Sequence, residues 1–302
     1  YAEARGEFPS VLAQGLSTDQ LGPNGIPSAI TVSSQFNVQE SKLISFFGRV
    51  NYNIRDRYLF NASLRRDGSS RFGAGNQWGT FPSIAAAWRL SEESVLKDRW
   101  NLSDLKLRAS WAKTGNQSFG NYLQYSTYSI GDAEAQYQFA DSFFTQIRPS
   151  AVDPNIKWEA TKSFNLGLDF GFSNQRYTGT IDVYRKSTDD LIFNVTAAAG
   201  TAPGDNITTN IGSMRNTGIE LSLSAKVLQG GLTGQGLRWT ADLPASHNTN
   251  ELIAINPFGG NAVAQQIPTG FIGGLGQTIQ ILRPGVPINS FYVYEHKMRN
   301  GK

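Results

Sequence analysis

One side of residues 43–54 is apolar and the other is mostly polar. The sequence there reads Leu43-Ile44-Ser45-Phe46-Phe47-Gly48-Arg49-Val50-Asn51-Tyr52-Asn53-Ile54, and its side chains alternate with a period of two, as in a β-strand. Three polar residues, Arg55-Asp56-Arg57, lead into a second alternating run from Tyr58 to Arg66. Because three residues are a hairpin length, the pattern predicts two long antiparallel strands joined by a tight turn.

The composition of the 302 residues is typical of an all-β protein whose strands are polar on one side. Glycine occurs 31 times, aromatic residues make up 12% of the chain, and the mean hydropathy is -0.32. The net charge is only +3 and basic runs are no longer than the pairs Arg65-Arg66 and Arg185-Lys186, so we expect no nucleic-acid partner. Cysteine is absent, which excludes disulfides and thiolate zinc sites.

No apolar run approaches the roughly 20 residues of a membrane helix. A membrane-spanning β-strand needs only about 9–11 residues with one apolar face, so the low hydropathy is compatible with a membrane β-barrel. The chain begins at Tyr1 without a signal peptide, and we interpret it as an internal or processed segment of a longer protein.

Similar alternating runs recur along the chain and predict about eight strands. After the first hairpin they centre on residues 82–90, 105–111, 163–172, 177–184, 219–225 and 239–243. The remaining segments lack steady alternation. We interpret residues 1–42 as a loop with a short strand near 30–32, residues 92–97 as one helical turn, and residues 114–158 as a functional or partly structured loop. Residues 187–210 are interpreted as a long loop, and residues 248–302 as largely loop until 291–294.

The connections between the predicted strands alternate in length. Those at 55–57, 173–176 and 230–236 are short and 91–103 groups with them, whereas 67–79, 114–158 and 187–210 are long. Short turns at one end and long loops at the other are typical of a transmembrane β-barrel. In that fold the apolar side of each strand meets lipid and the polar side lines the lumen. We expect Asp169 and Asp182 to line water or a polar interior, because an unpaired buried ion is costly.

The same alternation also fits a secreted, soluble β-sandwich that binds or cleaves polysaccharide. In a sandwich the apolar side of each strand is buried between two sheets, and the outer sides are polar. The loop asymmetry favours the membrane barrel, since a sandwich has less reason to keep it.

Several ordered blocks between about residues 43 and 250 carry a family resemblance. They are residues 47–52, 57–59 and 63–72, Trp78-Gly79-Thr80-Phe81-Pro82-Ser83, Trp88-Arg89-Leu90-Ser91-Glu92-Glu93, Leu105-Lys106-Leu107-Arg108-Ala109-Ser110-Trp111, Thr114-Gly115-Asn116-Gln117, Pro154-Asn155-Ile156-Lys157-Trp158-Glu159 and Asn216-Thr217-Gly218-Ile219-Glu220. Taken together, the blocks resemble the SusC/RagA group of TonB-dependent outer-membrane transporters.

This resemblance implies an outer-membrane barrel of about 22 strands, from Bacteroidetes-type bacteria, that imports oligosaccharides or peptides. It also implies a plug in the lumen, a SusD-like surface lipoprotein as a lid, and energy from the TonB-ExbB-ExbD complex through parts absent here. About eight strands cannot close such a barrel, so residues 1–302 are expected to be a partial TonB-dependent receptor barrel domain. We expect no enzyme activity and no cofactor. Pro244 departs from the family pattern, since proline cannot donate a ladder hydrogen bond.

Aromatic residues in and beside the long loops are the first candidate ligand-binding set: Trp78, Tyr122, Tyr125, Tyr128 and Trp158. Their rings could stack on sugars, or they could form an aromatic girdle at the membrane interface, which is our preferred interpretation. Arg71 ends a basic run that starts at Arg65 and could bind an anionic group. The preferred interpretation is that Arg65 pairs with lumen carboxylates and that Asp67-Gly68 is turn chemistry.

Metal and nucleotide sites have weak support. His247 and His296 are the only histidines and no third ligand stands out, so we expect no zinc site or general base there. The loop carboxylates Asp132, Asp141, Asp189 and Asp190 lack the spacing of a calcium loop. Residues 270–276 are glycine-rich but match neither phosphate-binding motif, and we interpret them as a loop.

Overall fold

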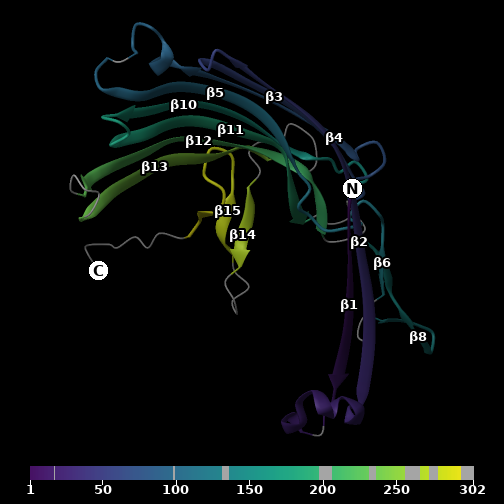
Figure 1. Ribbon diagram of the computed structural model, residues 1–302. Helices are drawn as coiled ribbons and strands as arrows, with labels where there is room; N and C mark the ends of the chain where they lie inside the picture. The colour runs from purple at the N-terminus through teal and green to yellow at the C-terminus, as the bar shows by residue number, and fades with distance from the viewer. Residues whose placement is uncertain are drawn as a thin grey trace, which may run out of the picture.

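The computed structural model describes residues 1–16, 18–97, 99–130, 136–196, 206–230, 236–255, 266–271 and 278–293. Its main feature is one antiparallel nine-stranded sheet that curves into an open arch (Figure 1). In spatial order its strands are β1 (Ala2–Gln14), β2 (Thr31–Ile54), β3 (Tyr58–Ser69), β4 (Trp78–Arg89), β5 (Leu102–Asn116), β10 (Glu159–Phe172), β11 (Tyr177–Thr196), β12 (Asn206–Gln229) and β13 (Arg238–Ile255). The prediction of an all-β fold is confirmed, and so is the prediction that these strands form part of a barrel without closing it.

Smaller elements lie between the strands of the main sheet and after β13. They are η1 (Asp19–Ser28), η2 (Leu90–Glu92), the pair β6 (Tyr128–Ile130) and β9 (Ile147–Pro149), the pair β7 (Gln136–Phe139) and β8 (Ser142–Thr145), and the sheet of β14 (Ile267–Phe271), β15 (Thr278–Leu282) and β16 (Ser290–Phe291). The segment 114–158 is therefore partly structured, which is one of the two alternatives that the sequence left open. η2 lies just before the expected helical turn at 92–97, and within that range the Leu96 and Lys97 N–H groups donate to the Glu93 carbonyl at 3.0 and 2.9 Å, as in one helical turn.

The opening hairpin is present as predicted. Ile54 lies opposite Tyr58, and the Arg57 backbone N–H donates to the Ile54 carbonyl at 3.0 Å. Arg55 and Asp56 take left-handed φ values of 54° and 55°, which the tight reversal requires. The Asn53 side chain accepts from the Asp56 N–H at 3.0 Å and fixes the turn.

The apolar sides of neighbouring strands are in register across the sheet. Val50, Ala62, Ile84, Trp111 and Phe164 form one cross-strand row. Val50, Ile84 and Phe164 are 68%, 58% and 52% exposed, so no second sheet covers them, as the sandwich alternative would require. A broad apolar face of this kind is costly in water and favourable in lipid.

The opposite face is polar. Asn51, Asn61, Ala85, Ser110 and Asn165 form the matching row, in which Asn61 donates to Asn51. This polar face is the concave one. Ile288, in the segment that follows β15, donates its N–H to Asn250 on the polar side of β13, and β14 and β15 lie beneath the arch (Figure 1). The sheet therefore has the polarity of a barrel wall, with an apolar outer face and a polar inner face.

The prediction that residues 1–42 form a loop is wrong. β1 pairs along its whole length with residues 31–43 of β2, and η1 joins the two strands. This ribbon, which we call the arm, projects away from the arch (Figure 1). Most of its residues are exposed on both faces. Alternation reports one-sided burial, so a ribbon without a buried face carries no such signal.

The prediction of a loop at residues 187–210 is also wrong at both ends, because β11 continues to Thr196 and β12 begins at Asn206. The register shifts between Thr188 and Leu191, and Asp190 has a left-handed φ of 58°. Such a bulge bends a strand and changes the phase of its side chains. Beyond it, Leu191 packs in one apolar cluster and Ile192 against another, so both sides of the strand are apolar and alternation ends.

The expectation for the last residues also needs correction. β13 runs through Pro244, which lies opposite Ser222, and continues to Ile255. β13 is an edge strand of this sheet, and edge strands tolerate a missing N–H. Residues 248–302 were expected to be largely loop, but the described part also contains β14, β15 and β16.

Candidate functional site

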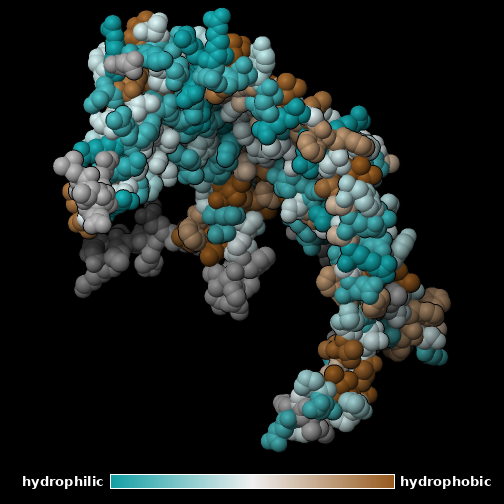
Figure 2. Space-filling model, in the orientation of Figure 1, coloured by the Kyte–Doolittle hydropathy of each residue, from teal (hydrophilic) through white to brown (hydrophobic). Residues whose placement is uncertain are grey.

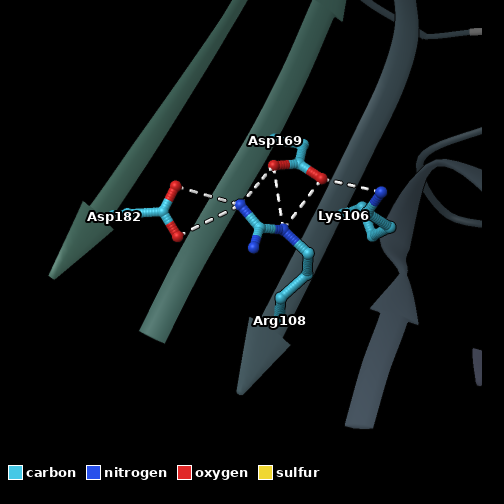
Figure 3. A network of polar contacts seen from close by, with 4 residues as sticks. All are labelled: Lys106, Arg108, Asp169 and Asp182. Atoms are coloured by element: carbon cyan, nitrogen blue, oxygen red, sulfur yellow. Dashed lines mark hydrogen bonds and ion pairs between the residues drawn. The ribbon is translucent and has the colours of Figure 1, made fainter. Parts of the chain in front are cut away.

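The polar face carries a network of four charged side chains on three adjacent strands (Figure 3). Arg108 donates to both carboxylate oxygens of Asp169 at 2.8–3.0 Å and to those of Asp182 at 3.1–3.2 Å. Lys106 Nζ lies 2.7 Å from Asp169 Oδ2. The side chains of Asp169 and Asp182 are 16% and 20% exposed. Each carboxylate is therefore paired, as expected of ions that line a polar interior.

Gly167 makes the longer of these bridges possible. It lies between Arg108 and Asp182 in one cross-strand row. A Cβ atom at this position would lie 2.5 Å from Asp182 Oδ1 and 2.7 Å from Arg108 Nη2. The guanidinium can cross β10 only because that strand has no side chain there. Gly167 is not among the residues predicted from sequence, although a glycine at a polar-face position between oppositely charged strands is a signal that could have indicated it.

A second cluster lies at the end of the sheet that carries the long loops. Phe72, Phe81, Ile156 and Trp158 form a buried apolar group. The Phe72 and Trp158 rings lie 4.6 Å apart, and the Trp158 indole donates to the Gln77 carbonyl at 3.1 Å. This group joins the connection after β3 to the segment before β10. We call it the mouth cluster.

The six predicted ligand-binding residues occupy different environments. Trp158 is 9% exposed and serves the mouth cluster, whereas Tyr125 and Tyr128 are 62% and 70% exposed. Trp78 shares the apolar face with Phe46, whose ring it stacks against at 6.3 Å, and Arg66 lies over its ring at 5.3 Å. A tryptophan on the lipid-facing side beside a basic group is typical of a girdle.

Arg71 and Tyr122 hold the loop after β5 in place. Arg71 donates to Asn121 Oδ1 at 2.9 Å and to the Gln117 carbonyl at 2.8 Å. Tyr122 Oη accepts from the Glu40 backbone N–H at 2.8 Å, so this loop is tied to the arm. Gln124, 7% exposed, donates to the Ser70 carbonyl at 3.1 Å.

The inner wall has a recess beside the mouth cluster. It is a cleft of about 300 Å³ lined by Leu43, Arg65, Asp67, Phe81, Thr114, Gly115, Gln117 and Trp158. Arg65 Nε lies 2.8 Å from Asp67, so Arg65 pairs with a carboxylate as predicted. Asp67 and Gly68 belong to β3, not to a turn, which corrects their predicted role.

At the short-turn end, three side chains converge on Glu93. Trp88 Nε1 donates to Glu93 at 3.0 Å and Tyr58 Oη at 2.9 Å, while Arg57 lies 3.4 Å away. The hydrogen bond from Trp88, then that from Tyr58, holds the pKa of the Glu93 carboxyl below its usual range. The stacked Tyr58 and Trp88 rings add aromatic groups to the apolar face at this end.

The remaining predicted positions take no part in these clusters. His247 lies opposite Ile219, whereas His296 and Asp132 lie outside the described residues. Asp189 pairs with Lys162 and Asp190 with Lys157, each at 3.0 Å. Within the described ranges, no group of three or more His, Cys, Asp or Glu side chains is placed to hold a metal ion. The described helices include none that is long and apolar enough to cross a membrane.

Comparison with known proteins assigns this architecture. The family model "TonB dependent receptor-like, beta-barrel" matches residues 6–297. The TonB-dependent receptor SusC of Bacteroides thetaiotaomicron is 42% identical over 86% of this chain and 26% of SusC. TonB-dependent receptor P3 of Formosa agariphila is 31% identical over 98% of this chain and 29% of its own length.

A solved structure agrees with these relatives. The RagAB peptide importer in the closed-closed state superimposes with a TM-score of 0.74 at 27% identity, over 96% of this chain and 30% of that chain. The chain thus spans between a quarter and a third of the lengths of the proteins it matches. The matched proteins are receptors and transporters, not enzymes. The chain belongs to the TonB-dependent receptor-like β-barrel family of outer-membrane proteins.

Proposed function

We propose that this chain is the middle part of the barrel wall of an active importer for a glycan or a peptide. The observation that carries the proposal is the two-faced sheet, because its apolar rows suit lipid and its charge-paired polar rows suit a water-filled path. Similarity to SusC and to the RagAB peptide importer supports import. The barrel wall needs no catalytic group for this task, since it binds and guides the solute.

The proposed partners follow from the same family membership. A SusD-like surface lipoprotein would cover the long-loop end, and the TonB-ExbB-ExbD complex would supply energy through parts of the protein that this chain does not span. The arm and the loop after β5, which are joined through Tyr122 and Glu40, project from the sheet at the end where such a lid would sit.

The proposed solute contacts are the exposed tyrosines of the long loop. Tyr125 and Tyr128 have free ring area, and Arg71 keeps the loop beside them in place through Asn121 and Gln117. Trp158 contributes by shaping the inner cleft, and Trp78 fits the girdle role better than solute binding.

An uptake assay tests the proposal. Bacteria that carry the full protein would be given a mixed polysaccharide hydrolysate and a tryptic protein digest, and mass spectrometry would follow which components disappear from the medium. We expect energised uptake of one class that stops when the TonB system is disabled. Uptake of neither class, or uptake that persists without TonB, would contradict the proposed function.

A further inference from the structure

The segment after β13 folds back along the free edge of that strand and over the end of its polar face. At the edge, Leu252 N–H donates to the Val286 carbonyl at 3.0 Å, and Gly285 N–H donates to the Leu252 carbonyl at 2.8 Å. Ile288 N–H donates to Asn250 Oδ1 at 2.9 Å. We call β14, β15, β16 and the residues 283–289 the strap.

The strap is also anchored by apolar packing. Leu282 of β15 is 3% exposed and packs with the fully buried Leu252 of β13. The cluster is completed by the buried residues Leu191, Val195, Ile211 and Ile255 and by the partly buried Phe193, Ile207, Met214, Ile267 and Ile288. Figure 2 shows hydrophobic side chains gathered beneath the arch, where Figure 1 places β14 and β15. Burial of this extent holds a segment in one position.

The position of the strap is inside the curve of the wall. Asn250 and Leu252 share the face of β13 that also carries Ser246 and Asn248, whereas Leu243 is on the apolar face. Leu252 and its neighbours therefore point to the concave side, where the solute would pass. Phe291, at the end of the strap, and the next residue, Tyr292, are 74% and 58% exposed.

We propose that the strap is a fixed constriction that limits the width of the solute. This inference rests on the proposed import function. A segment held by three hydrogen bonds and a buried cluster narrows the path without moving, so linear oligomers pass and branched oligomers of equal mass are held back. The strap thus selects solutes by their cross-section. Its contacts with β13 keep it in place and so determine how strongly wide solutes are excluded.

The test compares uptake of linear and branched probes by the full protein in cells. The probes are linear and branched oligosaccharides of matched mass, and linear and isopeptide-branched peptides of matched mass. We expect wild type to take up the linear probe of one class and to reject its branched counterpart. Leu252→Ala, or Ile288→Ala from the strap side, should raise the branched-to-linear uptake ratio at least fivefold.

Two controls keep the outcomes separate. Leu243→Ala is the same change on the same strand, but on the apolar face, and should leave the ratio unchanged. The pair Asn250→Cys and Ile288→Cys, joined by a short thiol crosslinker, should keep linear uptake within twofold of wild type. This chain has no cysteine of its own to compete.

The other possible results would contradict either the proposed role of the strap or the proposed import function. Loss of linear uptake on crosslinking would mean that the strap moves as a gate, and an unchanged ratio in folded Leu252→Ala and Ile288→Ala would mean that it does not limit width. Gel electrophoresis verifies that the variants are folded, because a folded barrel migrates differently in unheated and heated samples. Wild type that takes up neither linear probe would contradict the proposed import function itself.

Discussion

Gly167 shows how one missing side chain organises the inner wall. Arg108 on β5 reaches Asp182 on β11 across the backbone of β10, and it bonds Asp169 on the way. Lys106 completes the set, so two cations balance two carboxylates. A polar wall of paired charges avoids isolated ions near lipid and leaves no strong net charge at this level of the path.

A double-mutant cycle of Arg108→Ala and Asp182→Ala should measure this bridge. Both side chains are partly exposed, so we expect a coupling free energy of about 1 kcal/mol in urea unfolding at low salt. The same cycle in a Gly167→Ala background should give coupling near zero, because the added Cβ blocks the crossing. Undiminished coupling in that background would contradict the role assigned to Gly167.

The exposed tyrosines should affect solute affinity. The double change Tyr125→Ala and Tyr128→Ala should raise the apparent KM for uptake at least about 5-fold, since two aromatic contacts contribute roughly 0.5–1.5 kcal/mol each. Trp100→Ala is the control, because Trp100 is 77% exposed at the opposite end of the sheet. Equal effects of the two changes would rule out a specific contact.

The Glu93 cluster should make stability depend on pH. Because the folded pKa is lowered, the hydrogen bonds from Trp88 and Tyr58 stabilise the protein above the unfolded pKa of about 4.3, and this contribution is lost as the pH falls through the folded value. Thermal unfolding in detergent should give wild type a higher Tm than Glu93→Gln at pH 7, and the difference in Tm should shrink as the pH is lowered below the unfolded pKa. A difference in Tm between wild type and Glu93→Gln that grows as the pH falls would contradict this prediction.

At the scale of elements, the bend in β11 explains why one strand was read as ending too early. Up to Thr188 its side chains alternate between lipid and the polar face. The bulge at Asp190 then turns the strand into a region where Leu191 and Ile192 both find apolar partners. A continuous apolar run is the sequence signal of a strand buried on both sides, and Asp190-Leu191-Ile192-Phe193 contains one.

Elements with one lipid-facing side were predictable from sequence, and the others were not. The hairpin β2–β3 and the pair β10–β11 gave clean period-two patterns because lipid imposes the alternation. The arm gave none, since neither of its faces is buried and most of its residues are exposed. The charge network could be predicted only as carboxylates that line a polar interior, because the register that brings Arg108 to Asp182 depends on tertiary pairing.

The arm depends on its contact with the loop after β5, because a two-stranded ribbon is marginally stable alone. Tyr122→Phe removes the acceptor for Glu40 N–H and should speed hydrogen exchange in residues 31–42 about 3- to 10-fold, as expected for one hydrogen bond of about 1 kcal/mol. Tyr125→Phe, at the more exposed neighbour, should leave exchange in the arm unchanged. Equal exchange in both variants would mean that the arm is held elsewhere.

At the scale of the whole molecule, the two faces of one sheet suit different surroundings, lipid for the apolar face and water for the polar face. Large apolar side chains lie exposed along the outer rows, while paired charges and amides line the inner rows. The strap and the mouth cluster then fill the concave side at the long-loop end. Under the proposed function, solute selection takes place at that end, and the outer rows face lipid.

The most direct test is single-cysteine labelling of the full protein in outer-membrane vesicles. Val50→Cys and Phe164→Cys lie in an outer row, and Asn51→Cys and Asn165→Cys lie next to them in an inner row. Because the outer row faces lipid and the inner row faces water, we expect a membrane-partitioned maleimide to label the first pair and a small water-soluble maleimide to label the second. The opposite pattern, or equal labelling of all four by the water-soluble reagent, would contradict it.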